Sequence, residues 1–85
     1  MNTNAALLAR RQQAVPRALT HATNAYAHHA KNAEIWDVEG RRYVDFAGGI
    51  AVLNTGHCHP KIMAAATEQM GRFTHSCVQV LAYEP

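Results

Sequence analysis

The chain has 85 residues, enough for one domain at most, and a nearly balanced formal charge of +2. Leu, Ile, Val and Phe account for 16 residues, about 19%, below the ~20% at which a core becomes difficult to build. The low net charge argues against an ordinary disordered chain. Because its many alanines bury little area, we expect the chain to fold only against a larger partner surface.

The composition also limits the compartment and the partners. Cys58 and Cys77 are too few for a disulfide framework, and no stretch approaches the ~18 apolar residues of a membrane span. The basic residues are too sparse for a nucleic-acid surface. The stretch before Glu34 carries arginines and no acid, as organelle transit peptides do, but it lacks serine and is interrupted by Pro16. These features favour an ordinary N-terminal helix.

Residues 4–15 are predicted to form that first helix, with Asn4 as its N-cap. Pro16 ends it, because the residue before a proline avoids the helical region. Residues 17–32 are small and polar without a clear period, so we expect a covering loop there.

A β-hairpin is predicted next, with strands at residues 34–36 and 41–46. Asp37 at the first and Gly40 at the last position of the connection favour a type I turn followed by a left-handed glycine. In residues 47–53 the adjacent Gly48 and Gly49 predict a bend that lets another group approach the backbone closely.

The last predicted elements are a helix at residues 60–73 and an extended segment at residues 76–81. Pro60 suits the first helical position, and it follows a turn that contains Gly56. One apolar face follows at helical spacing. It consists of Ile62, Ala66, Met70 and Phe73.

A zinc site and a Schiff-base lysine are both suggested by single residues, but we expect structural or surface roles for these residues. The His57-Cys58-His59 and His75-Ser76-Cys77 clusters suggest zinc, but the ligands within each cluster are too close in sequence, so turn or capping roles are expected and no metal. Lys31 and Lys61 are expected at the surface, although a Schiff-base lysine requires burial or a nearby cation.

The motifs taken together point to one family. The runs IWDVEGRRYVDFAGGIAVLNTGHCHPKI (35–62), THSC (74–77) and QVLAYEP (79–85), with AVPR (14–17), closely resemble class III (ornithine-type) pyridoxal-phosphate (PLP) aminotransferases. Within that class the chain is most similar to bacterial enzymes of the 4-aminobutyrate type or their 5-aminovalerate relatives. Residues 18–24 depart from the family, whose members usually carry glycines and a proline there.

The resemblance implies a fold-type I α/β enzyme, several times longer, cytoplasmic and homodimeric, that transfers an amino group from an ω-amino acid to 2-oxoglutarate. In it residues 1–16 would be the N-terminal helix, residues 17–53 part of the small domain, and residues 54–85 the connecting turn and helix with the start of the large domain, so that no domain is complete. The family's Schiff-base lysine, its aspartate at the pyridine nitrogen and its phosphate loop would lie downstream. The 85 residues alone are therefore expected to be inactive and to hold no covalent cofactor.

The resemblance also places substrate-facing residues. Ile50 would contact the methylenes of an ω-amino acid, and Cys77, Val78 and Gln79 would form another wall of the pocket. No catalytic residue is expected in this chain. Three alternatives stay open: Ile50 as a core residue, a small His/Cys metal module, and a truncated or spurious reading frame without a stable fold.

Overall fold

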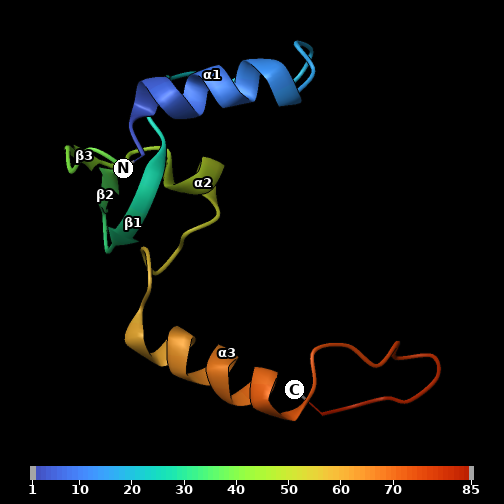
Figure 1. The fold of residues 1–85 in the computed structure, drawn as a ribbon. Coiled ribbons are helices and arrows are strands. Elements are labelled where there is room, and N and C mark those ends of the chain that lie inside the picture. Colours follow the sequence, from blue (N-terminus) through green and yellow to red (C-terminus); the bar gives the residue numbers. More distant parts are fainter. Residues whose placement is uncertain (1, 85) are drawn as a thin grey trace.

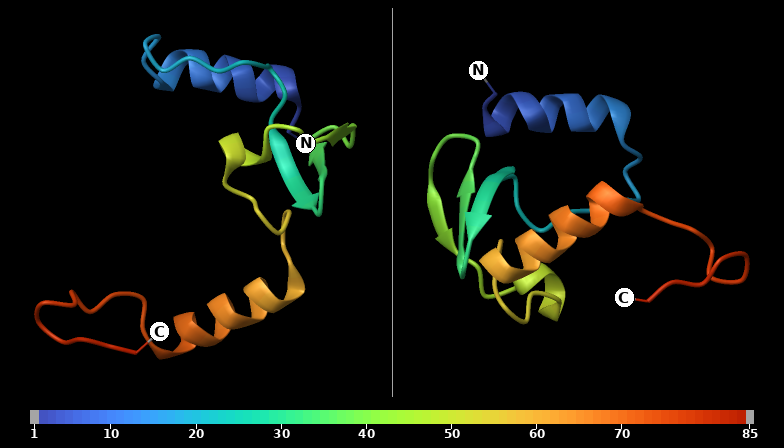
Figure 2. Two further views of the ribbon diagram at one scale, coloured as in Figure 1. Left: turned by 180° about the vertical axis from the view of Figure 1, so that it is seen from behind. Right: turned by 90° about the horizontal axis from the view of Figure 1, so that it is seen from below.

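The computed structural model describes residues 2–84 and shows three parts strung along the chain (Figure 1). Helix α1 (Asn4–Ala14) and helix α3 (Pro60–Arg72) lie on opposite sides of a small sheet, and residues 73–84 form a loop beyond α3. The radius of gyration is 17.2 Å, against about 12 Å for a compact domain of this length. The chain is thus open (Figure 2). Residues 1 and 85, at the limits of the predicted first and last parts, lie outside the described residues.

The sheet has three antiparallel strands in the order β1 (Ala27–Lys31), β2 (Glu34–Asp37) and β3 (Arg42–Val44). Strand β1 falls in the predicted covering loop, so that prediction is wrong for residues 27–31. The sequence AHHAK has no apolar alternation because β1 is an edge strand with four of its five residues exposed. Backbone pairing with β2 and a stack of His29 on Trp36, 4.8 Å between ring centroids, define it instead.

The predicted hairpin is confirmed, with a shorter second strand. The Gly40 N–H donates to the Asp37 carbonyl at 3.0 Å, and Gly40 has the expected left-handed φ of 81°. Strand β3 ends at Val44, and Phe46, which was placed in it, is 95% exposed beyond the sheet.

A buried carboxylate joins α1 to the hairpin. Asp37 accepts hydrogen bonds at 2.9 Å from the Asn4 amide, the Tyr43 hydroxyl and the backbone N–H groups of Glu39 and Arg41. Burial raises the pKa of Asp37, but these hydrogen bonds outweigh it, that of Asn4 first, and lower the pKa to about 2. Asp37 therefore stays ionised and fixes the start of α1.

Both long helices begin with a capping side chain. The Thr3 hydroxyl accepts from the Ala6 N–H at 3.1 Å, so Thr3 is the N-cap of α1 and the prediction of Asn4 was one residue late. The Asn4 amide is engaged by Asp37 instead. His59 caps α3, whose first residue is Pro60 as predicted.

The predicted extended segment at residues 76–81 is wrong. Cys77 has a left-handed φ of 54°, and its carbonyl accepts from the N–H groups of Val80 and Leu81 at 2.8 and 3.1 Å. These bonds close a tight turn. The alternation of side-chain types along residues 76–81 does not predict it. Helix α3 ends at Arg72, with Phe73 as its extended C-cap.

Among residues 2–84 no apolar side chain is buried, and the apolar face of α3 is open: Ile62 is 56% and Met70 63% exposed. Within the same residues no helix has the length and apolar character to cross a membrane. The segment thus holds its shape by backbone pairing and polar contacts rather than by a core.

Candidate functional site

The Gly-Gly bend forms a left-handed turn, α2 (Gly48–Ala51). All four residues have positive φ, between 54° and 66°. Glycine adopts this region freely, but Ile50 and Ala51 carry a Cβ that crowds the backbone there, at a cost of about 1–2 kcal/mol per residue. Strain of this kind is often found at functional sites.

Ile50 projects from this turn and is 88% exposed. Within this segment Ile50 is therefore not a core residue, which was the alternative interpretation. An exposed, conformationally fixed aliphatic side chain can offer apolar surface to a ligand or to another part of a protein.

A short hydrogen bond between Asp45 and His57 supports the turn. Asp45 Oδ1 accepts from the Gly48 N–H at 2.9 Å, and Asp45 Oδ2 lies 2.6 Å from His57 Nε2. A carboxylate only accepts, so Nε2 carries the proton. The hydrogen bond from His57 and then that from Gly48 hold the pKa of Asp45 below its ordinary value. No local sequence pattern predicts this contact, since the partners are twelve residues apart.

The other predicted substrate residues lie elsewhere. Cys77, Val78 and Gln79 are exposed in the turn beyond α3, where the Cys77 Sγ lies 3.3 Å from Gln79 Oε1. Helix α3 separates this turn from α2 in the views of Figures 1 and 2. The segment therefore does not bring Ile50 together with residues 77–79.

The two lysines do not fit a cofactor-binding amine. Lys31 lies on the edge strand β1 and Lys61 in the first turn of α3, and both are exposed. A Schiff-base lysine needs a desolvated or electrostatically depressed amine. Neither lysine of the described residues is therefore placed to form a Schiff base with PLP.

Both histidines of the His57-Cys58-His59 cluster have structural partners. His59 Nδ1 accepts from the Lys61 N–H at 3.2 Å, the capping role that was predicted, and His57 pairs with Asp45. Across residues 2–84 no three His, Cys, Asp or Glu side chains are grouped as a metal site would require.

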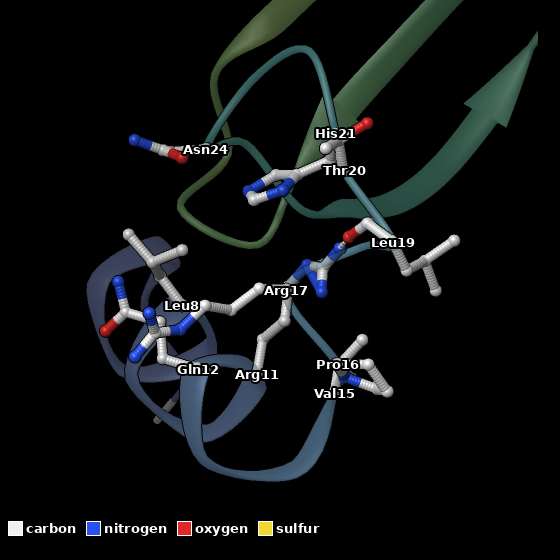
Figure 3. A pocket seen from close by; sticks show the side chains of 10 residues that line it. All are labelled: Leu8, Arg11, Gln12, Val15, Pro16, Arg17, Leu19, Thr20, His21 and Asn24. Carbon is white, nitrogen blue, oxygen red and sulfur yellow. Dashed lines mark hydrogen bonds between the residues drawn. The ribbon is translucent and has the colours of Figure 1, made fainter.

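A groove of about 630 Å³ lies between α1 and residues 16–24 (Figure 3). Its lining carries the basic side chains of Arg11, Arg17 and His21. The Arg11 guanidinium donates a hydrogen bond to the Leu19 carbonyl, and this contact holds residues 16–24 against α1. Part of residues 18–24, where the sequence predicts a departure from the family, thus forms one wall of an open surface groove.

Comparisons with known proteins agree with these motifs. The model of the family "Aminotransferase class-III" matches residues 15–85. The 5-aminovalerate aminotransferase DavT of Pseudomonas aeruginosa is 61% identical over 83 residues, and the 4-aminobutyrate aminotransferase GabT of Escherichia coli is 56% identical over 85 residues. These alignments cover 98% and 100% of this chain, which spans about a fifth of the length of each relative.

Solved structures show the same backbone. Ornithine aminotransferase from Toxoplasma gondii superposes with a TM-score of 0.82 at 30% identity, over 100% of this chain and 19% of that one. For acetylornithine aminotransferase from Elizabethkingia anophelis the TM-score is 0.85 at 24% identity, over 100% of this chain and 20% of that one, a likeness of fold. The small sheet and its flanking helices are thus a segment of the fold-type I architecture, and the chain belongs to the class-III aminotransferases.

Proposed function

We propose that the chain is part of a PLP-dependent ω-amino acid aminotransferase, which transfers an amino group from 4-aminobutyrate or 5-aminovalerate to 2-oxoglutarate. The observation that carries the proposal is the identity of 61% and 56%, over nearly every residue, to enzymes named for these two amino donors. The ornithine aminotransferase of Toxoplasma gondii is 30% identical over the whole chain, and that of Schizosaccharomyces pombe is 53% identical over only 55% of it.

The proposal gives the segment a binding role. Ile50 contacts the methylenes of the donor, and Cys77, Val78 and Gln79 form a second wall that the rest of the protein brings into reach. These side chains are exposed in this segment, so they are open to contact with a ligand or with the rest of the protein. An apolar side chain suits a donor whose middle is a methylene chain.

The rest of the proposal concerns the whole protein. When bound, PLP acts as an electron sink for the amino-acid carbanion. A structure of the Toxoplasma ornithine aminotransferase describes PLP at its active site, which supports this cofactor here. The division into residues 1–16, 17–53 and 54–85, the homodimer and the cytoplasmic location belong to the same proposal.

The test is transamination by the full-length protein expressed from its own gene and supplied with PLP. Glutamate formed from 2-oxoglutarate is measured with 4-aminobutyrate, 5-aminovalerate, ornithine and acetylornithine as donors. We expect the largest kcat/KM with one of the first two. A preference for ornithine or acetylornithine contradicts the proposed substrate class, and no glutamate with any donor contradicts the proposed enzyme.

A further inference from the structure

The left-handed turn α2 requires an external restraint. Ile50 and Ala51 have φ of 61° and 59°, which residues with a Cβ seldom adopt. Such backbone persists when surrounding contacts over-determine it. Within the turn the Val52 N–H reaches the Gly48 carbonyl at 3.0 Å, but this bond closes the turn without fixing it to the sheet.

Asp45 supplies a connection on the turn side. One oxygen accepts from Gly48, the first left-handed residue, and the other receives the His57 proton at 2.6 Å. The Asp45 N–H also donates to the Ala33 carbonyl at 2.7 Å, beside the sheet. The Asp45 side chain is 9% exposed, so water competes little for its oxygens.

His57 supplies the connection on the other side. Its backbone pairs reciprocally with Asn32, with N–O distances of 3.0 and 2.8 Å. Gly56 lies so close to Asn32 that a Cβ there would come within 3.0 Å of the Asn32 carbonyl oxygen. An unbroken series of contacts therefore runs from the β1–β2 connection through His57 and Asp45 to Gly48.

We propose that Asp45 and His57 are positioning residues, which hold the Gly48–Ala51 turn left-handed and thereby set the position of Ile50 against the amino donor. The part that concerns the donor rests on the proposed function. A donor one methylene longer or shorter meets Ile50 at a different point, so release of the turn changes selectivity between 5-aminovalerate and 4-aminobutyrate.

The first experiment is independent of activity. Amide hydrogen exchange of residues 47–53 is measured in the full-length protein and in Asp45→Ala. The matched control is Tyr43→Phe, which removes a 2.9 Å hydrogen bond to the buried carboxylate of Asp37. We expect exchange in residues 47–53 to accelerate about tenfold in Asp45→Ala, because bonds to a charged acceptor are lost, and to stay unchanged in the control. Unchanged exchange in Asp45→Ala overturns the proposal.

The second experiment measures kcat/KM for both donors in the same variants. The ratio of the two values is expected to shift about tenfold in Asp45→Ala, to shift less in Asp45→Asn, which keeps an acceptor for Gly48 but loses the acceptor for the His57 proton, and to be unmoved in Tyr43→Phe. Equal loss for both donors with an unchanged ratio means that the pair supports folding alone, and overturns the positioning role.

Two further outcomes keep the test decisive. If Asp45→Ala does not fold, His57→Phe, which keeps a ring and loses Nε2, is measured by the same two criteria. If the wild-type protein uses neither donor, the proposed function fails, while hydrogen exchange still decides whether Asp45 and His57 hold the turn.

Discussion

Ile50 combines a strained backbone with an exposed side chain, a pairing that packing within the segment does not explain. We expect Ile50→Gln in the full-length protein to lower kcat/KM for 4-aminobutyrate about 10- to 200-fold, because an amide would face the donor's methylenes. The control is Val44→Gln, at another exposed β-branched residue, on β3. Equal kcat/KM for wild type and Ile50→Gln would show that Ile50 does not contact the donor.

Asp37 gives the segment a pH-dependent contribution to stability. Its pKa is about 2 in the folded chain and 3.8 ordinarily, so folding favours the ionised form. The stabilisation is complete above about pH 4 and is lost as the pH falls toward 2. The free energy of unfolding of the full-length protein, compared with Asp37→Asn, should therefore differ most above pH 4 and converge toward pH 2.

The control for this experiment is Glu68→Gln, at an exposed position on α3. Its difference from wild type should lack the convergence between pH 4 and pH 2 that is expected for Asp37→Asn. A gap between wild type and Asp37→Asn that stays constant across this range would contradict the role given to the buried carboxylate.

Two glycines test how the elements are built. Gly56 has φ of 78° and lies against the Asn32 backbone, whereas Gly71 lies in α3 with open space around it. We expect Gly56→Ala to destabilise the full-length protein by about 1–3 kcal/mol, and Gly71→Ala to stabilise it by about 0.5–1 kcal/mol. Denaturant unfolding measures both, and a Gly56→Ala variant as stable as wild type would contradict the close packing seen here.

The elements that the sequence predicts correctly are those with local signals. Helix α3 has a proline at its first position and apolar residues at helical spacing, and the hairpin has turn residues between strand formers. Strand β1 was missed because an exposed edge strand is defined by backbone pairing with β2, which leaves no apolar alternation.

The features of the candidate site also differ in how far the sequence predicts them. The Gly48-Gly49 bend follows from neighbouring residues, whereas the substrate-facing role of Ile50 is predicted from the family resemblance. The pair of Asp45 and His57 depends on the path of the chain between them, and the turn at Cys77 on a left-handed residue that is not glycine. No local sequence pattern predicts either the Asp45–His57 pair or the turn at Cys77.

At the scale of the whole molecule, the segment is open and no apolar side chain among residues 2–84 is buried. Apolar burial is the main force that offsets chain entropy. The 85-residue chain alone should therefore unfold without a cooperative transition in calorimetry. A sharp transition whose calorimetric and van't Hoff enthalpies agree would refute this.

On the proposed function, these residues serve as the matching segment of an ω-amino acid aminotransferase. A chimera tests this: that segment of the E. coli 4-aminobutyrate aminotransferase, 56% identical over 85 residues, is replaced with this chain, and kcat/KM for 4-aminobutyrate is measured. We predict a value within about tenfold of the parent enzyme, which is about 1.4 kcal/mol in transition-state binding. A folded, PLP-loaded chimera without transamination of 4-aminobutyrate would contradict the claim.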